Sequence, residues 1–134
     1  MENPARSCSA KKNITDEDIF DNILIHGDNL LALKALEPEF GGAVRCIYID
    51  PPFNTGHAFQ HYEDGIEHAL WLSLMRDRLV ILAKLLSEDG SIWVHCDDNE
   101  QAYLKVMMDE IFGRDCFVST VVWQSRYSRS NDAG

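Results

Sequence analysis

The chain has 134 residues, of which 46% are hydrophobic, 10% aromatic and 25% charged. These proportions are ordinary for one globular domain, and they exclude global disorder. Its 12 basic residues stand against 22 acidic ones, which gives a formal net charge of -10, so the net charge of this chain does not favour contact with the phosphates of a nucleic acid.

The sequence shows no targeting or membrane segment. No apolar stretch approaches the ~20 residues that a membrane span needs, and the amino terminus, MENPARSCSAKKN, lacks the apolar region of a secretory signal. We therefore expect a cytoplasmic protein without membrane contact. The cysteines have no C-x-x-C spacing, which is typical of reduced thiols rather than of a disulfide framework or a zinc site.

The first two predicted elements are a strand and a helix. NILIH (residues 22–26) is a short apolar run that ends at Gly27-Asp28, which predicts a strand followed by a turn. LLALKAL (30–36) has leucines at helical spacing, and we expect Pro38 and Gly41-Gly42 to break this helix. Asp28, at the start of the helix, is either its N-cap or a residue that contacts a ligand.

A second strand leads directly into a carboxylate. VRCIYI (44–49) is β-branched and aromatic, and Asp50-Pro51-Pro52 follows it, where the two prolines remove backbone donors and end the strand. A buried strand is therefore expected to present Asp50 at its carboxyl end. Residues 51–64 have no sustained period and are rich in turn formers, so we expect a loop long enough to carry a function.

The next part of the pattern is a long helix followed by a strand. Apolar side chains fall on one helical stripe from residue 66 onward, and Gly90 is expected to close this helix. SIWVHC (91–96) predicts the next strand by its composition. The stripe consists of Trp71, Leu74, Met75, Leu79, Leu82, Leu85 and Leu86.

One more helix and one more strand complete the pattern. Asp97 or Asp98 is expected to cap the helix, with Glu100 or Gln101 placed as in a capping box. CFVSTVVW (116–123) is the last strand candidate because it is rich in β-branched and aromatic residues.

The order of the elements, β-α-β-loop-α-β-α-β, predicts an α/β fold with a mostly parallel sheet and helices on its faces. Ligands of such sheets collect at the carboxyl ends of the strands. A functional site is therefore expected along this edge. Polar residues follow three of the four predicted strands, as His26-Gly27-Asp28, Asp50-Pro51-Pro52 and His95-Cys96-Asp97-Asp98.

The motif IYIDPPFNTG (47–56) carries the most specific chemistry. The Asp50 carboxylate and the Pro51 carbonyl are able to accept both hydrogens of an exocyclic amine while the Phe53 ring stacks on the base that bears it. An amine held by two acceptors is withdrawn from conjugation with its ring and becomes a better nucleophile. This arrangement favours amino methylation over a structural role in which Asp50 starts a turn and Phe53 fills the core.

The motif resembles the D-P-P-[YF] catalytic motif of amino-methylating DNA methyltransferases, and the surrounding sequence resembles the modification (Mod) subunit of type III restriction-modification systems. The resemblance implies a partial Rossmann-like fold of the kind that uses S-adenosylmethionine. It extends over about residues 20–130, where NILIHGDNLLALKAL precedes the motif and WLSLMRDRL, LLSEDGSIWVHCDDNEQAYLKVMMDEIFG and FVSTVVW follow it.

The resemblance also implies roles for individual residues. Asp50, Pro51, Pro52 and Phe53 would be the catalytic residues that hold a target adenine flipped out of double-stranded DNA, and the N6 atom of this adenine would attack the methyl group of S-adenosylmethionine. Asp28 and Asp50 would contact this cofactor. A restriction subunit and a second Mod subunit are the implied protein partners of the complete enzyme. The choice of adenine over cytosine rests on the resemblance alone.

The sequence departs from this family in one respect. The glycine-rich F-x-G-x-G turn that binds the cofactor, expected on the carboxyl side of the motif, is absent. We therefore expect residues 14–124 to be the amino-terminal part of a catalytic domain between flexible tails at 1–13 and 125–134, and we expect the chain alone to be inactive. A non-catalytic remnant or interaction module of the same fold is the alternative.

A metal-dependent nuclease is a weaker hypothesis. It would use His57, His61, Asp97 and Asp98, with His68 nearby, because two imidazoles four residues apart on a helix can share a metal ion. The loop around His57 and His61 has no helical pattern, and a third ligand at a fixed spacing is missing. No metal site is therefore predicted.

Overall fold

The computed structural model describes residues 22–55, 58–59, 62–63 and 67–123. The tails predicted at 1–13 and 125–134 lie outside the described residues. The described part combines helices with a parallel sheet and is therefore α/β, as predicted. In chain order its elements are α1 (Asn29–Phe40), β1 (Val44–Ile49), β2 (Ala58–Phe59), β3 (Tyr62–Glu63), α2 (His68–Leu85), β4 (Leu86–Val94), α3 (Gln101–Phe112) and the short 3-10 helix η1 (Arg114–Cys116).

Two strands form the sheet next to the core. β1 and β4 are parallel, with Tyr48 opposite Trp93, and both of these side chains are more than half exposed. The strands predicted at 44–49 and 91–96 are therefore present and adjacent. β2 and β3 pair antiparallel inside the segment predicted to be a loop.

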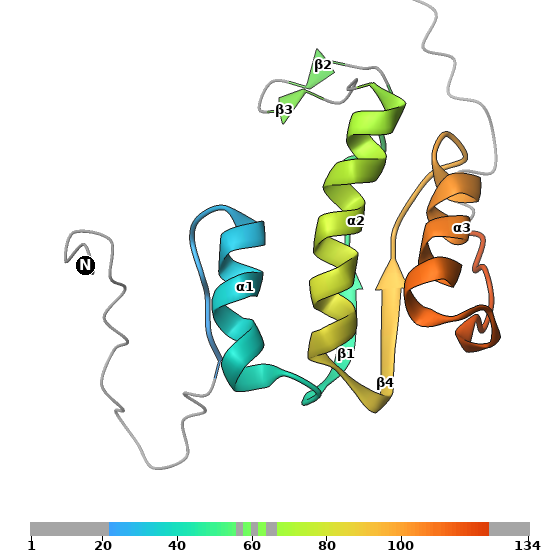
Figure 1. The fold of residues 1–134 in the computed structure, drawn as a ribbon. Coiled ribbons are helices and arrows are strands. Elements are labelled where there is room, and N and C mark those ends of the chain that lie inside the picture. The colour runs from blue at the N-terminus through green and yellow to red at the C-terminus, as the bar shows by residue number, and fades with distance from the viewer. Residues whose placement is uncertain (1–21, 56–57, 60–61, 64–66, 124–134) are drawn as a thin grey trace, which may run out of the picture.

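Figure 1 shows how the helices and strands are oriented. α2 lies between α1 and α3 and packs against both of them. β1 and β4 end at the same edge of the sheet, and all three helices begin at this end of the molecule. The segments that follow the two strands are therefore gathered together. Within the described ranges, no helix combines the length and the apolar character needed to cross a bilayer.

The core is built around α2. Of the nine apolar side chains that are buried in the described part, six belong to α2, and Trp71, Met75 and Leu79 are almost fully buried. These three residues belong to the predicted stripe, so the helix and its buried face are confirmed. The other elements contribute Ile47 from β1 and Leu104 and Met107 from α3.

Two predicted strands are not formed. Residues 22–26 have no strand pairing, and the segment 116–123 begins in η1 and continues without strand structure. Leu24 and Val118 in these segments are 89% and 93% exposed. A strand needs a partner for its backbone hydrogen bonds, and in the part of the chain that the structure describes β1 and β4 pair only with each other.

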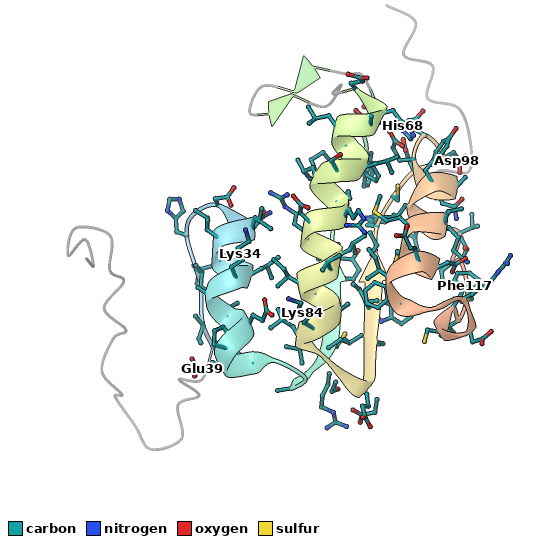
Figure 2. The ribbon with its side chains drawn as sticks, viewed as in Figure 1. Lys34, Glu39, His68, Lys84, Asp98 and Phe117 are labelled. Atoms are coloured by element: carbon teal, nitrogen blue, oxygen red, sulfur yellow. The ribbon has the colours of Figure 1, made fainter. Side chains whose placement is uncertain are left out.

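Of the two breaks predicted for α1, only the second one ends the helix. α1 continues through Pro38 and ends at Phe40, with Gly41 as its C-cap. A proline this close to the end of a helix removes its own backbone hydrogen bond but leaves few later ones to disturb. The lower end of α1 is joined to α2 by the Lys84 ammonium, which donates to the Glu37 carboxylate at 2.8 Å. Figure 2 shows Lys84 near the end of α2.

α2 ends earlier than predicted, and Gly90 belongs to the sheet instead. The helix ends at Leu85, and Leu86 already lies opposite Val44 as the first residue of β4. Residues 87–90 then bulge before regular pairing resumes. A Cβ atom on Gly90 would lie 2.9 Å from the Val44 carbonyl oxygen, so a residue without a side chain is needed where the two backbones approach.

Candidate active site

The ends of β1 and β4 bring a carboxylate and an imidazole together. Asp50 directly follows β1, its side chain is 62% exposed, and its Oδ1 atom lies 3.2 Å from Nδ1 of His95. His95 directly follows β4, and its backbone N–H donates to the Ile49 carbonyl at 2.9 Å. Asp50 is therefore exposed at the sheet edge rather than buried in the core, which is the orientation that a substrate-binding role requires.

Phe53 contacts the same imidazole. Its ring meets His95 edge to face, with ring centroids 5.4 Å apart and planes at 84°, and Tyr48 approaches His95 with a centroid distance of 6.4 Å. His95 thus joins the carboxylate and the aromatic ring of the motif. The sequence placed His95 at this edge without giving it a role, although parallel pairing of the two predicted strands was the signal that pointed to it.

The segment after β1 is fastened to the core. We call residues 50–55 the DPPF loop. Trp71, which is fully buried in α2, donates its indole Nε1–H to the carbonyl oxygen of Pro52 at 2.8 Å. Pro51 is half-buried and Pro52 is exposed. The second proline of the motif is therefore held by the most buried part of the molecule.

A buried carboxylate fastens the DPPF loop from the side of α3. Glu100 is only 3% exposed. Its Oε1 atom accepts a hydrogen bond from Asn54 Nδ2 at 2.6 Å, and its Oε2 atom lies 2.7 Å from Nδ1 of His68, the first residue of α2. Asn54 has a φ of 60°, a conformation that asparagine tolerates better than most residues. No pattern in the sequence indicated that these three side chains converge.

The capping box predicted at the start of α3 is wrong. α3 begins at Gln101, and the side chain of its N-cap residue, Glu100, makes no capping hydrogen bond because its two oxygens are bonded to other elements. Asp97 accepts from the backbone N–H of Asn99 at 3.0 Å and so forms the turn before the helix. Asp98 is exposed at the same end of the molecule as His68 (Figure 2).

Asp28 takes one of the two roles that the sequence left open. Its Oδ1 atom accepts a hydrogen bond from the backbone N–H of Leu31 at 3.0 Å, which makes it the N-cap of α1. α1 begins at the end of the molecule where β1 and β4 end (Figure 1). A contact between Asp28 and a cofactor stays a prediction.

Cys96 is an unreactive thiol at this edge. Burial raises its pKa from 9.0 to about 11, and the negative charge of Asp97 acts in the same direction. The thiol is therefore protonated at neutral pH, and a protonated thiol is a poor nucleophile.

The metal hypothesis gains no support from the geometry. His57 and His61 lie outside the described residues. Among the residues that are described, no group of three or more His, Cys, Asp or Glu side chains is placed to hold a metal ion. His68 is paired with Glu100 instead and lies edge to face against Tyr103 at a centroid distance of 4.3 Å.

The described residues do not fit S-adenosylmethionine as a complete site. Neither long strand of the described part leads into a glycine-rich turn, because prolines follow β1 and His95 follows β4. The Asp28 carboxylate is already bonded to the first turn of α1. Asp50, Phe53 and the residues between them form the polar and aromatic edge at the end of β1, and no glycine-rich turn that could receive the adenosine part of a cofactor lies among the described residues.

Comparisons with known proteins agree with the motif. Residues 44–134 match the family model described as DNA methylase. The chain is 47% identical over 115 residues to the probable type III restriction-modification enzyme HindVI Mod subunit of Haemophilus influenzae, a match that covers 86% of this chain and 15% of that protein.

Two further relatives also match most of this chain over a small part of their own length. The type III restriction-modification enzyme StyLTI Mod subunit of Salmonella typhimurium is 38% identical over 84% of this chain and 22% of its own length. The type II methyltransferase M.EcaI of Enterobacter cloacae is 37% identical over 84% of this chain and 26% of its own length. The chain thus spans between 15% and 26% of the length of these three relatives.

Proposed function

Because the chain belongs to the DNA methylase family, we propose that it forms the target-base part of a DNA adenine N6 methyltransferase of a type III restriction-modification system. The observation that carries this proposal is the exposed Asp50 carboxylate at the end of β1, which lies next to His95, the same imidazole that the Phe53 ring meets edge to face. A carboxylate and an aromatic ring at one exposed edge suit a flipped-out purine that bears an exocyclic amine.

Each residue of the motif has a role in this proposal. Asp50 and the Pro51 carbonyl accept the two N6 hydrogens, Phe53 stacks on the adenine ring, and Pro52 keeps the loop rigid. Two acceptors draw the N6 lone pair out of conjugation and so raise its nucleophilicity. S-adenosylmethionine, when bound, would supply the methyl group, whose bond to the sulfonium sulfur would break as the bond to N6 forms, leaving a neutral thioether. We assign the Asp50 carboxylate as the acceptor of the proton that N6 would then give up. Asp50 need not be a strong base for that step.

The remaining parts of the proposal rest on the family and on the names of the relatives. We place S-adenosylmethionine as the methyl donor, with Asp28 and Asp50 at the border of its site, and a Rossmann-like sheet as the fold of the complete enzyme. The substrate is double-stranded DNA, and the partners are a restriction subunit and a second Mod subunit in the cytoplasm. The net charge of -10 implies that other segments supply the positive surface that DNA requires.

A second candidate is a non-catalytic interaction module of the same fold. The absence of a glycine-rich turn after either long strand of the described part favours it. A module of this kind has no need to bind a base, so base binding distinguishes the two candidates.

The experiment that tests the proposed function is an NMR titration of the chain with 9-ethyladenine and 1-ethylcytosine. We expect the adenine probe to shift the resonances of Phe53 and His95 more strongly than the cytosine probe, and we expect Phe53→Ala to remove these shifts. Shifts confined to other parts of the chain, or unchanged by Phe53→Ala, would exclude the DPPF loop as the base-binding site and favour the interaction module.

A further inference from the structure

Glu100 is a buried carboxylate for which the proposed chemistry has no use. It lies at the start of α3 and is 3% exposed. An ionised carboxylate is costly to bury unless hydrogen bonds or opposite charges compensate for its lost hydration. The burial of Glu100 is therefore explained by the hydrogen-bond partners of its two oxygens.

The two carboxylate oxygens contact side chains from two segments that are distant from Glu100 in the sequence. Asn54, 46 residues before Glu100, donates its side-chain N–H to Oε1 at 2.6 Å. His68, 32 residues before Glu100, places Nδ1 at 2.7 Å from Oε2. The ring of His68 also lies against Tyr103 of α3. Glu100 thus joins the DPPF loop, the start of α2 and the start of α3 at one point.

The DPPF loop has a second anchor on the other side of Phe53. Trp71 holds the Pro52 carbonyl at 2.8 Å, and Glu100 holds the Asn54 side chain. The residues immediately before and after Phe53 are therefore both fixed to buried side chains. A ring fixed in this way loses less conformational freedom when it stacks on a ligand, and this preorganisation strengthens binding.

We propose that Glu100 is a positioning residue for the target base. It does not touch the base, and it acts by holding Asn54 so that Phe53 and Asp50 keep the geometry that receives the adenine ring. This inference rests on the proposed function, because the DPPF loop is the base-binding site in that proposal.

The test compares four variants of the whole 134-residue chain. Glu100→Ala removes both acceptor oxygens, whereas Glu100→Gln keeps a carbonyl oxygen for Asn54. Asn54→Gly removes the same contact from the side of the loop and tolerates the positive φ at this position. Glu110→Gln changes an exposed glutamate on the same helix and is the matched control. The probe is 9-ethyladenine, and the urea midpoint of each variant shows whether the fold is retained.

We expect Glu100→Ala and Asn54→Gly to bind 9-ethyladenine about three- to tenfold more weakly than the unmodified chain, with broadened Phe53 ring resonances. We expect the affinities of Glu100→Gln and Glu110→Gln for 9-ethyladenine to stay within about twofold of that of the unmodified chain. If Glu100→Ala also lowers the urea midpoint, the affinity of Asn54→Gly for 9-ethyladenine tests the positioning role instead, because this variant leaves α3 unchanged. Equal affinity in the unmodified, Glu100→Ala and Asn54→Gly chains overturns the positioning role and leaves the proposed function intact. An unmodified chain that does not bind the probe overturns the proposed function and the positioning role with it.

Discussion

The indole Nε1–H of Trp71 donates to the carbonyl oxygen of Pro52 at 2.8 Å. Trp71 is fully buried and belongs to the central helix, α2, whereas Pro52 is exposed and belongs to the DPPF loop. One hydrogen bond therefore connects the packing of the core to the shape of the candidate site, so changes in the core are expected to alter the site as well.

Replacing Trp71 with phenylalanine keeps an aromatic ring in the core and removes the indole N–H. We expect the free energy of unfolding to fall by about 1–3 kcal/mol, because the smaller ring leaves a cavity and the Pro52 carbonyl loses its donor. Urea denaturation measures this loss. Trp93→Phe is the control, since Trp93 is half exposed and its indole N–H donates to the Ser91 hydroxyl at 3.2 Å rather than to the DPPF loop. Equal losses in the two variants would contradict the importance assigned to the Trp71 bond.

Removing the imidazole of His95 tests the connection between Asp50 and Phe53. His95→Ala deletes the edge-to-face partner of the Phe53 ring, a contact of about 0.5–1.5 kcal/mol, so we expect the affinity for 9-ethyladenine to fall about two- to twelvefold. NMR titration measures the dissociation constant. His26→Ala, at an exposed histidine before α1, serves as the control. An unchanged dissociation constant for His95→Ala would remove His95 from the site.

Gly90 tests the close approach of β1 and β4. A methyl group at this position meets the Val44 carbonyl oxygen at 2.9 Å and the Leu86 side chain at 2.8 Å, and such overpacking costs about 1–3 kcal/mol. We expect Gly90→Ala to lower the urea midpoint accordingly. Glu88→Ala, an exposed residue of the same bulge, should leave the midpoint nearly unchanged. A Gly90→Ala chain as stable as the unmodified one would show that the backbones separate without cost.

Cys96 has a pH dependence that follows from its raised pKa. Burial favours the neutral thiol and raises its pKa from 9.0 to about 11, so between these values the unfolded state is deprotonated while the folded state is still protonated. The stabilising contribution of Cys96 is therefore complete below pH 9.0 and is lost as the pH rises to about 11.

Alkylation with iodoacetamide measures the deprotonation of the Cys96 thiol directly, because only the thiolate reacts. We expect the labelling rate of Cys96 to rise about tenfold per pH unit between pH 8 and 10, as followed by mass spectrometry. The labelling rate of Cys46, which is exposed, is the reference for a cysteine that the reagent reaches freely. A Cys96 rate that levels off near pH 9 would contradict the raised pKa.

The elements that the sequence predicted well are those whose pattern is local. The apolar stripe through Trp71 and Leu79 defines a buried face of α2 without reference to any partner. The β-branched run at 44–49 ends at Asp50 because proline follows, and this is where β1 ends. The α/β alternation around these elements was predictable for the same reason.

The features that the sequence did not reveal depend on distant partners. Residues 22–26 have a strand composition, but strand structure requires a neighbour, and none pairs with them in the described part. Glu100 has the spacing of a capping residue, yet its carboxylate bonds Asn54 and His68 instead. No local pattern distinguishes a glutamate that caps a helix from one that joins three segments.

The chain alone should transfer no methyl groups. The proposed function assigns a base-binding edge to its residues, but no complete cofactor site lies among the residues that the structure describes. We expect the purified chain, supplied with DNA and radiolabelled S-adenosylmethionine, to label adenine no faster than a blank. Robust labelling would refute this prediction and would require cofactor contacts beyond those described.

In the proposed function, Asp50 and the DPPF loop bind the adenine that is methylated. The most direct measurement is methyl transfer by a chimera in which this chain replaces the matching segment of the HindVI Mod subunit, to which it is 47% identical. We predict that the chimera forms N6-methyladenine in DNA, that Asp50→Ala abolishes this activity, and that Asp89→Ala, at an exposed aspartate before the regular part of β4, does not. A chimera that methylates adenine equally well with Asp50→Ala would contradict the claim.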